Sequence, residues 1–465
     1  RRSQMREGRS NRRGSRNALA GLSILATTGL IGTGFSYFRP IASYAAASGP
    51  CELDVFAGTT SAEISAAVGL AIAATDPSCT GLKLISEAAV TVNLDAQINP
   101  TFSGVSSFTL SGSTDDNGDP LVTLDGSNIV DGSGAPDGIL LVADVGSFTV
   151  DSLIFANGRD ETYGGAIYVE TSTNHLTVVN SEFRGNTAGY YGGAIFFVSG
   201  QGSGTLSVTG STFTSNSVTS DGFGYGGAIF TEATTSIYGS TFSLNTAVSL
   251  TTTRFNGYAY GGAVFAASIE TISGSTFSGN TAESRGSSAY GGAVFAASIE
   301  TISDSTFTSN TAEAKETGLS AYGGAVYTSG SITTISDSTF SDNTALSSYD
   351  ENYSYGGAVR AVSIETISDS TFSGNKAESD SYARGGAVFA LFSVETISGS
   401  TFSGNTAESH SYSAYGGAVN AVRSPSLAVH SSTFTSNTAE SNGSAHGGAL
   451  SINHTGSASV DLYGS

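Results

Sequence analysis

Basic residues are scarce after the first 39 positions, where ten Lys and Arg face 38 Asp and Glu, a net charge of 10 − 38 = −28. A surface of this sign repels nucleic acid and anionic lipid, so nucleic acid is excluded as a partner. It attracts divalent cations, and it suits a soluble surface protein that avoids self-association.

Long apolar runs and helical periodicity are also missing from the body of the chain. No stretch after residue 40 is long and apolar enough to span a bilayer, and no window repeats apolar residues at 3.6 spacing. Gly is frequent, with 60 residues, but 39% of the chain is hydrophobic, which is too apolar for a disordered linker. Short segments rich in Thr, Val, Ile and Phe, separated by Gly, Ser and Asn, predict repeated β-strands.

The N-terminus has the pattern of an export segment. Seven Arg lie between Arg1 and Arg16, an apolar run covers residues 18–38, and "ASYAAASG" follows. Residues 1–47 are therefore predicted to be a signal peptide, or alternatively an uncleaved N-terminal membrane anchor. Either predicts a secreted or cell-surface protein.

Only two cysteines are present, Cys51 and Cys79, just after that segment. In an exported chain they predict a disulfide bond. Between them, Thr60 and Glu63 have the spacing of a capping box that starts a short amphipathic helix. Residues 48–81 are predicted to cap the first coil of a solenoid.

Two motifs alternate along the rest of the chain, a Gly-Gly-Ala-aliphatic motif found ten times and a Phe-x-x-Asn motif found nine times. Self-similarity at a spacing of about 30 residues predicts a repeat architecture, here the coils of a parallel β-helix. The lengths that vary lie between "NTA" and "GGA" and are expected to be loops. The first motif begins at Gly164, Gly192, Gly226, Gly261, Gly291, Gly323, Gly356, Gly385, Gly416 and Gly447.

Strand alternation assigns side chains to faces. The aliphatic residue after each Gly-Gly-Ala and the Phe of each Phe-x-x-Asn are predicted to point inward and stack at about 4.8 Å. The Asn amides are expected to form an internal hydrogen-bonded ladder. Residues 82–157 are predicted to form irregular coils ending in a degenerate motif, Ile154–Asn157, and residues 158–465 the regular ones. Because Ser457–Ser465 stops in mid-repeat, the sequence is expected to be truncated at its C-terminus.

The alternation of the two motifs from about Tyr163 onward resembles the polymorphic outer membrane protein repeat, which is named for bacterial autotransporter-like adhesins. The resemblance implies an all-β fold, a right-handed parallel β-helix, here with the short capping helix at its N-terminus. It also implies a cell-surface or outer-membrane location and adhesion. The C-terminal β-barrel of that family has no counterpart in this sequence.

The residues do not form an enzyme signature. Lyases and hydrolases of the β-helix type need clustered carboxylates with a basic partner, whereas Lys and Arg are scattered and the five His show no paired spacing. No catalytic residue, cofactor site or defined metal site is assigned. "DDNGD" at Asp115–Asp119 is read as a polar turn rather than a Ca²⁺ loop.

Two acidic ranks recur at fixed repeat positions and predict either weak Ca²⁺ binding between coils or a solvated edge. The first rank is Glu270, Glu300, Glu365 and Glu395, and the second is Glu283, Glu313, Glu378, Glu408 and Glu440.

Two further sets are candidates for contact with other molecules. An outward aromatic stripe is either a binding surface for a sugar or protein, or is covered by the insert loops, which fold back over it with their own Tyr side chains. Three sequons offer glycosylation sites at Asn352, Asn442 and Asn453. The stripe consists of Phe196, Phe230, Phe265, Phe295, Tyr327 and Phe389, with Tyr168 before them.

The function predicted from the sequence is a non-catalytic adhesion or envelope scaffold whose partner is a host or neighbouring-cell surface glycan or protein. The alternative is a β-helix protein that binds or cleaves polysaccharide.

Overall fold

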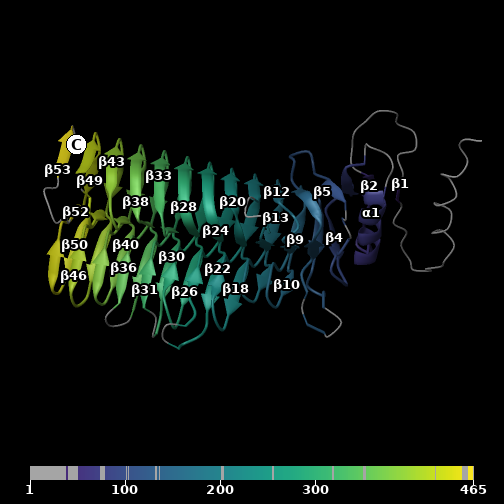
Figure 1. The fold of residues 1–465 in the computed structure, drawn as a ribbon, viewed down its shortest axis with the longest axis horizontal. Coiled ribbons are helices and arrows are strands. Elements are labelled where there is room, and N and C mark those ends of the chain that lie inside the picture. The colour runs from purple at the N-terminus through teal and green to yellow at the C-terminus, as the bar shows by residue number, and fades with distance from the viewer. Residues whose placement is uncertain are drawn as a thin grey trace, which may run out of the picture. The chain divides into compact units, whose positions relative to one another are not determined.

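The computed structural model describes residues 38–39, 51–73, 79–100, 102, 104–130, 134–135, 137–200, 204–253, 256–316, 319–348, 352–424, 426–452 and 459–463. The predicted segment 1–47 lies almost wholly outside these residues. The described chain is a parallel β-solenoid of about 12 turns with one helix near its N-terminal end (Figure 1). Within it, no helix has the length and apolarity needed to cross a membrane. The all-β repeat prediction is confirmed.

Each regular coil adds strands to four parallel sheets, here called sheets 1 to 4, which hold 23, 12, 10 and 8 strands. A representative coil contributes β24 (Val264–Ser273) to sheet 1 and β25 (Thr276–Ser278) to sheet 2. It continues with β26 (Thr281–Ser284) in sheet 3 and β27 (Ala289–Tyr290) in sheet 4. The next coil starts at β28 (Val294–Ser303), paired in register with β24.

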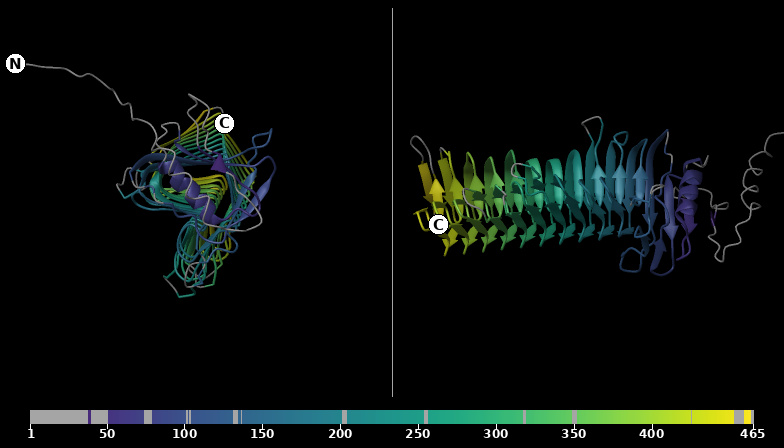
Figure 2. Two further views of the ribbon diagram at one scale, coloured as in Figure 1. Left: turned by 90° about the vertical axis from the view of Figure 1, so that its right-hand side faces the viewer. Right: turned by 90° about the horizontal axis from the view of Figure 1, so that it is seen from below.

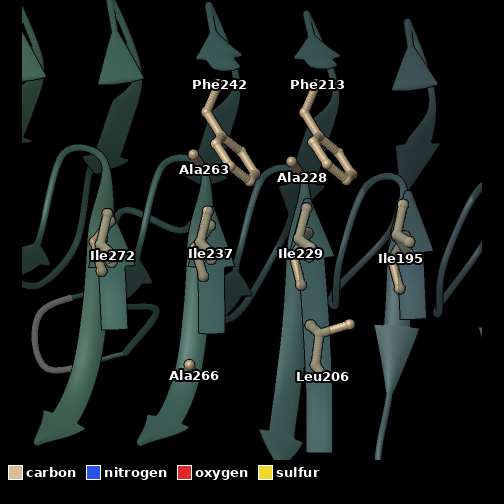
Figure 3. Packing of buried hydrophobic residues seen from close by; sticks show 14 of the residues in the cluster. Ile195, Leu206, Phe213, Ala228, Ile229, Ile237, Phe242, Ala263, Ala266 and Ile272 are labelled. Carbon is tan, nitrogen blue, oxygen red and sulfur yellow. The ribbon is translucent and has the colours of Figure 1, made fainter. Parts of the chain in front are cut away.

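Equivalent residues of the motifs therefore stack on one another. The aliphatic residue after Gly-Gly-Ala is fully buried from Ile167 through Val388, and the Phe of Phe-x-x-Asn is fully buried from Phe183 through Phe402. Successive Phe rings from Phe183 to Phe434 lie parallel with centroids 4.7 to 4.8 Å apart. Figure 3 shows Phe213 and Phe242 stacked above the Ile residues of neighbouring coils. The two inward ranks are confirmed.

The Asn of each motif closes the corner between sheets 2 and 3. Asn280 is buried and donates through Nδ2 to Oδ1 of Asn310 and to the carbonyl oxygen of Phe242, each at 2.9 Å. Its own Oδ1 accepts from the backbone N and the Nδ2 of Asn245, each at 3.0 Å. The same pattern runs from Asn186 to Asn437. The predicted ladder is confirmed, with every buried amide group satisfied.

The front of the solenoid is less regular. Sheet 1 begins with β2 (Cys51–Asp54), β3 (Gly81–Ile85), β5 (Val105–Gly112) and β8 (Val145–Asp151). Sheet 2 begins with β4 (Val90–Asn93), β6 (Val122–Asp125) and β9 (Ile154–Ala156).

The motif predicted at Ile154–Asn157 is wrong by one residue. Phe155, not Ile154, pairs with Phe183, and their rings lie 5.0 Å apart. Gly158 takes the Asn position, where its backbone N donates to Oδ1 of Asn186. Asn157 instead is exposed and donates to Asp125. The sequence interpretation took Asn157 as the corner residue and so placed the motif one residue early. The actual corner residue, Gly158, has no side-chain amide and joins the ladder only through its backbone N–H.

The segments predicted to be loops between "NTA" and "GGA" begin and end in short strands, with loops only in between. Sheet 3 runs from β10 (Arg159–Asp160) to β50 (Thr438–Ser441), and sheet 4 from β19 (Gly224–Tyr225) to β51 (Ser444–His446). Their facing side chains are small and form Ala clusters separate from the main core, such as Ala259, Ala282, Ala289 and Ala312. Seen along the stacking direction, these sheets form a narrow lobe beside the main core (Figure 2).

The Gly-Gly-Ala motif lies where the chain returns from this lobe to the core. Gly261 has φ = 60°, a left-handed conformation that favours glycine. At the next residue, Gly262, a Cβ would fall on the carbonyl oxygen of Gly292 in the following coil and on the backbone of Thr281 in sheet 3. The motif is therefore required by close backbone approach on two sides.

Candidate functional site

The predicted aromatic stripe forms one of two adjoining columns of rings on the outer surface. In sheet 1, neighbouring rings from Phe196 to Tyr327 lie 4.8 to 5.3 Å apart. A second column is built by the Tyr that precedes Gly-Gly-Ala in most coils, and its rings from Tyr191 to Tyr322 lie 5.0 to 5.1 Å apart. We call the two columns together the aromatic seam.

The two columns of the seam pack against each other edge to face. Tyr225 contacts Phe265 at 5.2 Å and Tyr260 contacts Phe295 at 5.0 Å, each ring touching the next coil of the other column. Edge-to-face pairs of this kind add to the free energy gained by area burial. Burial raises the pKa of the Tyr260 phenol well above its usual value, so this column stays neutral at physiological pH.

The stripe is therefore not a row of open rings. Phe230 and Phe389 are only 5% and 1% exposed, and the other four members are half-buried. The Tyr side chains that pack against the stripe come from strands of sheet 4, such as Tyr260 and Tyr290, rather than from loops folded back over it. What faces outward is the composite seam, in which partly exposed rings of both columns alternate.

The seam is interrupted in the later coils by residues that the sequence reading missed. Arg360 takes the place of Tyr327 in sheet 1, and Arg384 takes the place of Tyr355 in sheet 4. Asn420 takes the place of Phe389 two coils beyond Arg360. The signal was present in the repeats, because "RGGA" replaces "YGGA" and "AVRAV" replaces "AVFAA".

Each guanidinium continues the ring column as a planar cation. The Cζ atom of Arg360 lies 4.8 Å from the centroid of Tyr327, and that of Arg384 lies 4.9 Å from the centroid of Tyr415. These are cation–π distances. Among the described residues, no carboxylate lies within ion-pair distance of either guanidinium.

The second acidic rank is a stacked edge on sheet 3, and Lys side chains bridge it. Lys315 contacts Glu283 at 2.9 Å and Glu313 at 3.1 Å, and Lys376 contacts Glu378 and Glu408 at 2.7 Å each. The hydrogen bond from Lys376 is the main reason that the pKa of Glu408 is lowered. The Lys376 cation, rather than repulsion between stacked carboxylates, therefore decides the direction of this pKa shift.

His410 lies at the outer margin of this edge. Its Nδ1 is 3.0 Å from Oδ1 of Asp380 in the preceding coil, and its Nε2 is 3.2 Å from Oε1 of Glu408. The bond to Asp380 is the main cause that raises the pKa of His410.

Glu378, Glu408 and His410 each offer one ligand atom within 4.8 Å of the others. Lys376 already supplies positive charge to both of these carboxylates. Calcium bridging of the acidic ranks stays a prediction, which a melting temperature compared in millimolar Ca²⁺ and in chelator would check.

Comparison with known proteins bears on the repeat itself. The model of the Chlamydia polymorphic membrane protein repeat family matches residues 180–198 and 304–329. Two segments of the chain thus match the polymorphic membrane protein repeat. Each matched segment contains a Phe-x-x-Asn corner, and both continue the same sheets, so the repeat and the coil are one unit. No curated protein and no solved structure matches the chain.

The family is one of surface and outer-membrane proteins, and a surface adhesin-like protein fits the repeat and the β-solenoid together.

The cap that precedes the coils has the predicted disulfide and helix. Cys51 and Cys79 form a disulfide bond. The helix α1 (Ser61–Ala73) begins with the predicted capping box, in which the backbone N of Thr60 donates to Glu63 at 2.8 Å. Ile64 and Val68 of this helix are buried in the main core cluster.

The predicted glycosylation sites differ in their environment. Asn442 is exposed, although its Nδ2 donates to the carbonyl oxygen of His410. Asn352 is only 2% exposed, so the interpretation of this sequon as an accessible acceptor is wrong for the folded chain. The third, Asn453, lies outside the described residues.

The "DDNGD" segment is a turn, as predicted. The backbone N–H groups of Asn117 and Asp119 close it by donating to the Asp115 carboxylate.

A cavity of about 430 Å³ is lined by residues at the C-terminal ends of the paired strands β2 and β3. Glu52, Asp54 and Glu87 contribute to its lining, together with Val55, Ile85 and Ser86. Its lining thus includes three carboxylates but no basic residue, so a base for lyase chemistry would have to come from outside it.

Proposed function

We propose that this chain is a non-catalytic, surface-displayed solenoid that adheres to a glycan or protein on a host or neighbouring cell. The aromatic seam carries the proposal. It runs along successive coils in register, and it presents partly exposed rings at regular intervals on the outer surface. Aromatic rings with one polar edge are well suited to recognising sugars and protein partners.

The repeat family supports the location. Polymorphic membrane protein repeats occur in surface proteins, and the N-terminal Arg-rich and apolar segment of this sequence is of the kind that directs export. We infer a secreted or cell-surface protein, with retention through residues 1–47 if that segment is not cleaved. A solenoid of stacked coils holds the seam away from the point of attachment.

The test is binding of the fluorescently labelled full chain to a glycan array and to cells, combined with assays for polysaccharide degradation. We expect bound label without product. Tyr290→Ser, within the seam, should lose binding, whereas Tyr238→Ser, an exposed Tyr outside it, should retain binding. New reducing or unsaturated sugar ends would favour the polysaccharide-cleaving alternative, and equal binding by both variants would remove the seam from the proposal.

A further inference from the structure

Two arginines interrupt the aromatic seam at places where every earlier coil has a ring. Arg360 follows Tyr327 in the sheet 1 column, and Arg384 follows Tyr355 in the sheet 4 column. Both side chains are half-buried. In the seam, a ring of one coil contacts the ring of the next coil in the other column, as Tyr355 does with Phe389 at 4.6 Å. The pair Tyr355–Phe389 therefore lies between the two guanidinium groups.

These arginines differ from most other cations of the described solenoid. Arg184, Lys315 and Lys376 contact carboxylates at 2.7 to 3.1 Å. Arg360 and Arg384 contact aromatic faces instead, and Arg360 Nη1 donates only to the backbone oxygen of Thr328, at 3.0 Å. In a chain with 39 acidic and 18 basic residues, two half-buried cations in adjacent coils, neither paired with a carboxylate of the described residues, mark a place where an anion is accepted.

Hydrogen-bonding capacity is left over at the same place. The Nε atoms of Arg360 and Arg384 are buried and have no partner among the described residues. Asn420, one coil beyond Phe389, is only 2% exposed; its Nδ2 donates to the carbonyl oxygen of Ser451, but its Oδ1 has no partner. A buried polar atom without a partner costs about 1–3 kcal/mol, so these atoms need a ligand or water to satisfy them.

These unpaired donors and the unpaired acceptor indicate which kind of ligand would bind here. Arginine offers a fork of N–H donors that fits a carboxylate, and the Asn oxygen accepts a bond from a hydroxyl group. The neighbouring half-buried rings of Tyr355 and Tyr415 offer apolar surface. A molecule with carboxylate, hydroxyl groups and a C–H face is an acidic sugar.

We propose that Arg360, Arg384 and Asn420 form a subsite of the aromatic seam for a carboxylate-bearing glycan, such as a chain of uronic acids. This inference rests on the proposed adhesive function and specifies its ligand class. The carboxylates accept hydrogen bonds from the two guanidinium groups, and the sugar between them lies against the half-buried ring of Tyr355, which covers Phe389. Rings elsewhere in the seam extend the contact without selecting charge.

Calorimetric titration of the full chain tests the subsite. The probes are an oligogalacturonate and the same oligosaccharide with its carboxylates methyl-esterified. We expect the acidic probe to bind at least about tenfold more tightly than the neutral one, and to weaken as salt is raised. The variants Arg360→Gln and Arg384→Gln should each weaken acidic binding by about tenfold. Arg423→Gln, which removes a guanidinium lying 5.4 Å from the Phe392 ring outside the seam, should not.

The melting temperature of each variant checks that it is folded. Arg384→Lys, which keeps the charge, should recover part of the binding that Arg384→Gln loses. The subsite is overturned if both probes bind equally, if neither binds, or if Arg360→Gln, Arg384→Gln and Arg423→Gln all bind alike. These outcomes separate the two proposals. A chain that binds cells or neutral glycans through Tyr290, but not acidic probes through Arg360, keeps the adhesive function and loses this subsite.

Discussion

The Nδ2 of Asn280 lies 2.9 Å from the Oδ1 of Asn310, one coil further along the solenoid. The same Oδ1 also accepts from the backbone N of Asn280, at 3.0 Å. One side chain thus satisfies two donors of the coil before it. The contact joins coils through groups that are fully buried, so the ladder is where a coil is most sensitive to loss of a polar group.

Replacing Asn310 with Ala should therefore be costly. It leaves two donors of Asn280 and the carbonyl oxygen of Phe277 without their partner. We expect a loss of about 2–4 kcal/mol in the free energy of unfolding, measured by denaturant titration. Asn442→Ala is the matched control, because Asn442 is exposed and makes one bond to a backbone oxygen. Equal losses in the two variants would contradict the role of the ladder.

The close approach at Gly-Gly-Ala gives a second prediction. In Gly292→Ala the new Cβ would fall on the carbonyl oxygen of Gly324 and the backbone of Thr311, neither of which can move without parting two sheets. We expect poor expression or a melting temperature lowered by many degrees. Gly69→Ala in the helix α1 meets no atom within 4 Å and should be neutral or slightly stabilising. A well-folded Gly292→Ala protein would show that the coils can separate.

Alternation and repetition were enough to predict the solenoid, its inward ranks and the Asn ladder, because each depends on one residue type at one place in every coil. The lobe of sheets 3 and 4 was not predicted. Its facing residues are Ala and Ser, such as Ala282 and Ser284, which give no apolar signal, and its lengths vary between coils.

The seam was half predicted. The alternation of the strand predicted that Phe265 points outward. Its partial burial depends on Tyr225, which belongs to the preceding coil and to another sheet. The positions of Arg360 and Arg384 within the seam were missed for another reason, because single residues that interrupt a repeat do not contribute to its pattern.

Burial at Asn352 predicts which sequon is used. If the chain is expressed in a eukaryotic secretory host, we expect a glycan on Asn442, which is exposed, and none on Asn352. Intact mass should fall by one glycan in Asn442→Gln and stay unchanged apart from the substitution in Asn352→Gln. A glycan found on Asn352 would mean that this residue is modified before its coil closes.

His410 predicts a pH dependence of the charged edge. Its pKa is raised above the ordinary 6.5, chiefly by Asp380, so the stabilisation it gives is complete below that value and lost as pH rises through the folded pKa. The pKa of Glu408 is lowered by Lys376, so its contribution is present above its ordinary pKa and lost as pH falls through the folded one. The edge should be most stable at pH values between the folded-state pKa of Glu408 and that of His410.

An NMR titration of His410 checks the upper limit of this range. Its midpoint should lie above 6.5 and move down toward that value in Asp380→Asn, whereas Asp337→Asn, on another face, should leave it unchanged. The same midpoint in the unmodified protein and in Asp380→Asn would mean that the hydrogen bond between His410 and Asp380 is not populated in solution.

The disulfide predicts where the solenoid begins to unfold. Cys51 and Cys79 close a loop of 28 residues that holds α1 over the first coils, where Ile64 and Val68 complete the core. In a solenoid each coil contacts its neighbours, so removing this crosslink should weaken the front without reaching distant coils. In the double variant Cys51→Ser, Cys79→Ser we expect hydrogen exchange of the α1 amides to rise by the equivalent of about 2–4 kcal/mol, while the amides of β34 (Thr339–Ser341) stay protected. If α1 and β34 lost protection together, the coils would be unfolding as one cooperative unit, and the cap would be stabilising the whole solenoid rather than its first turn.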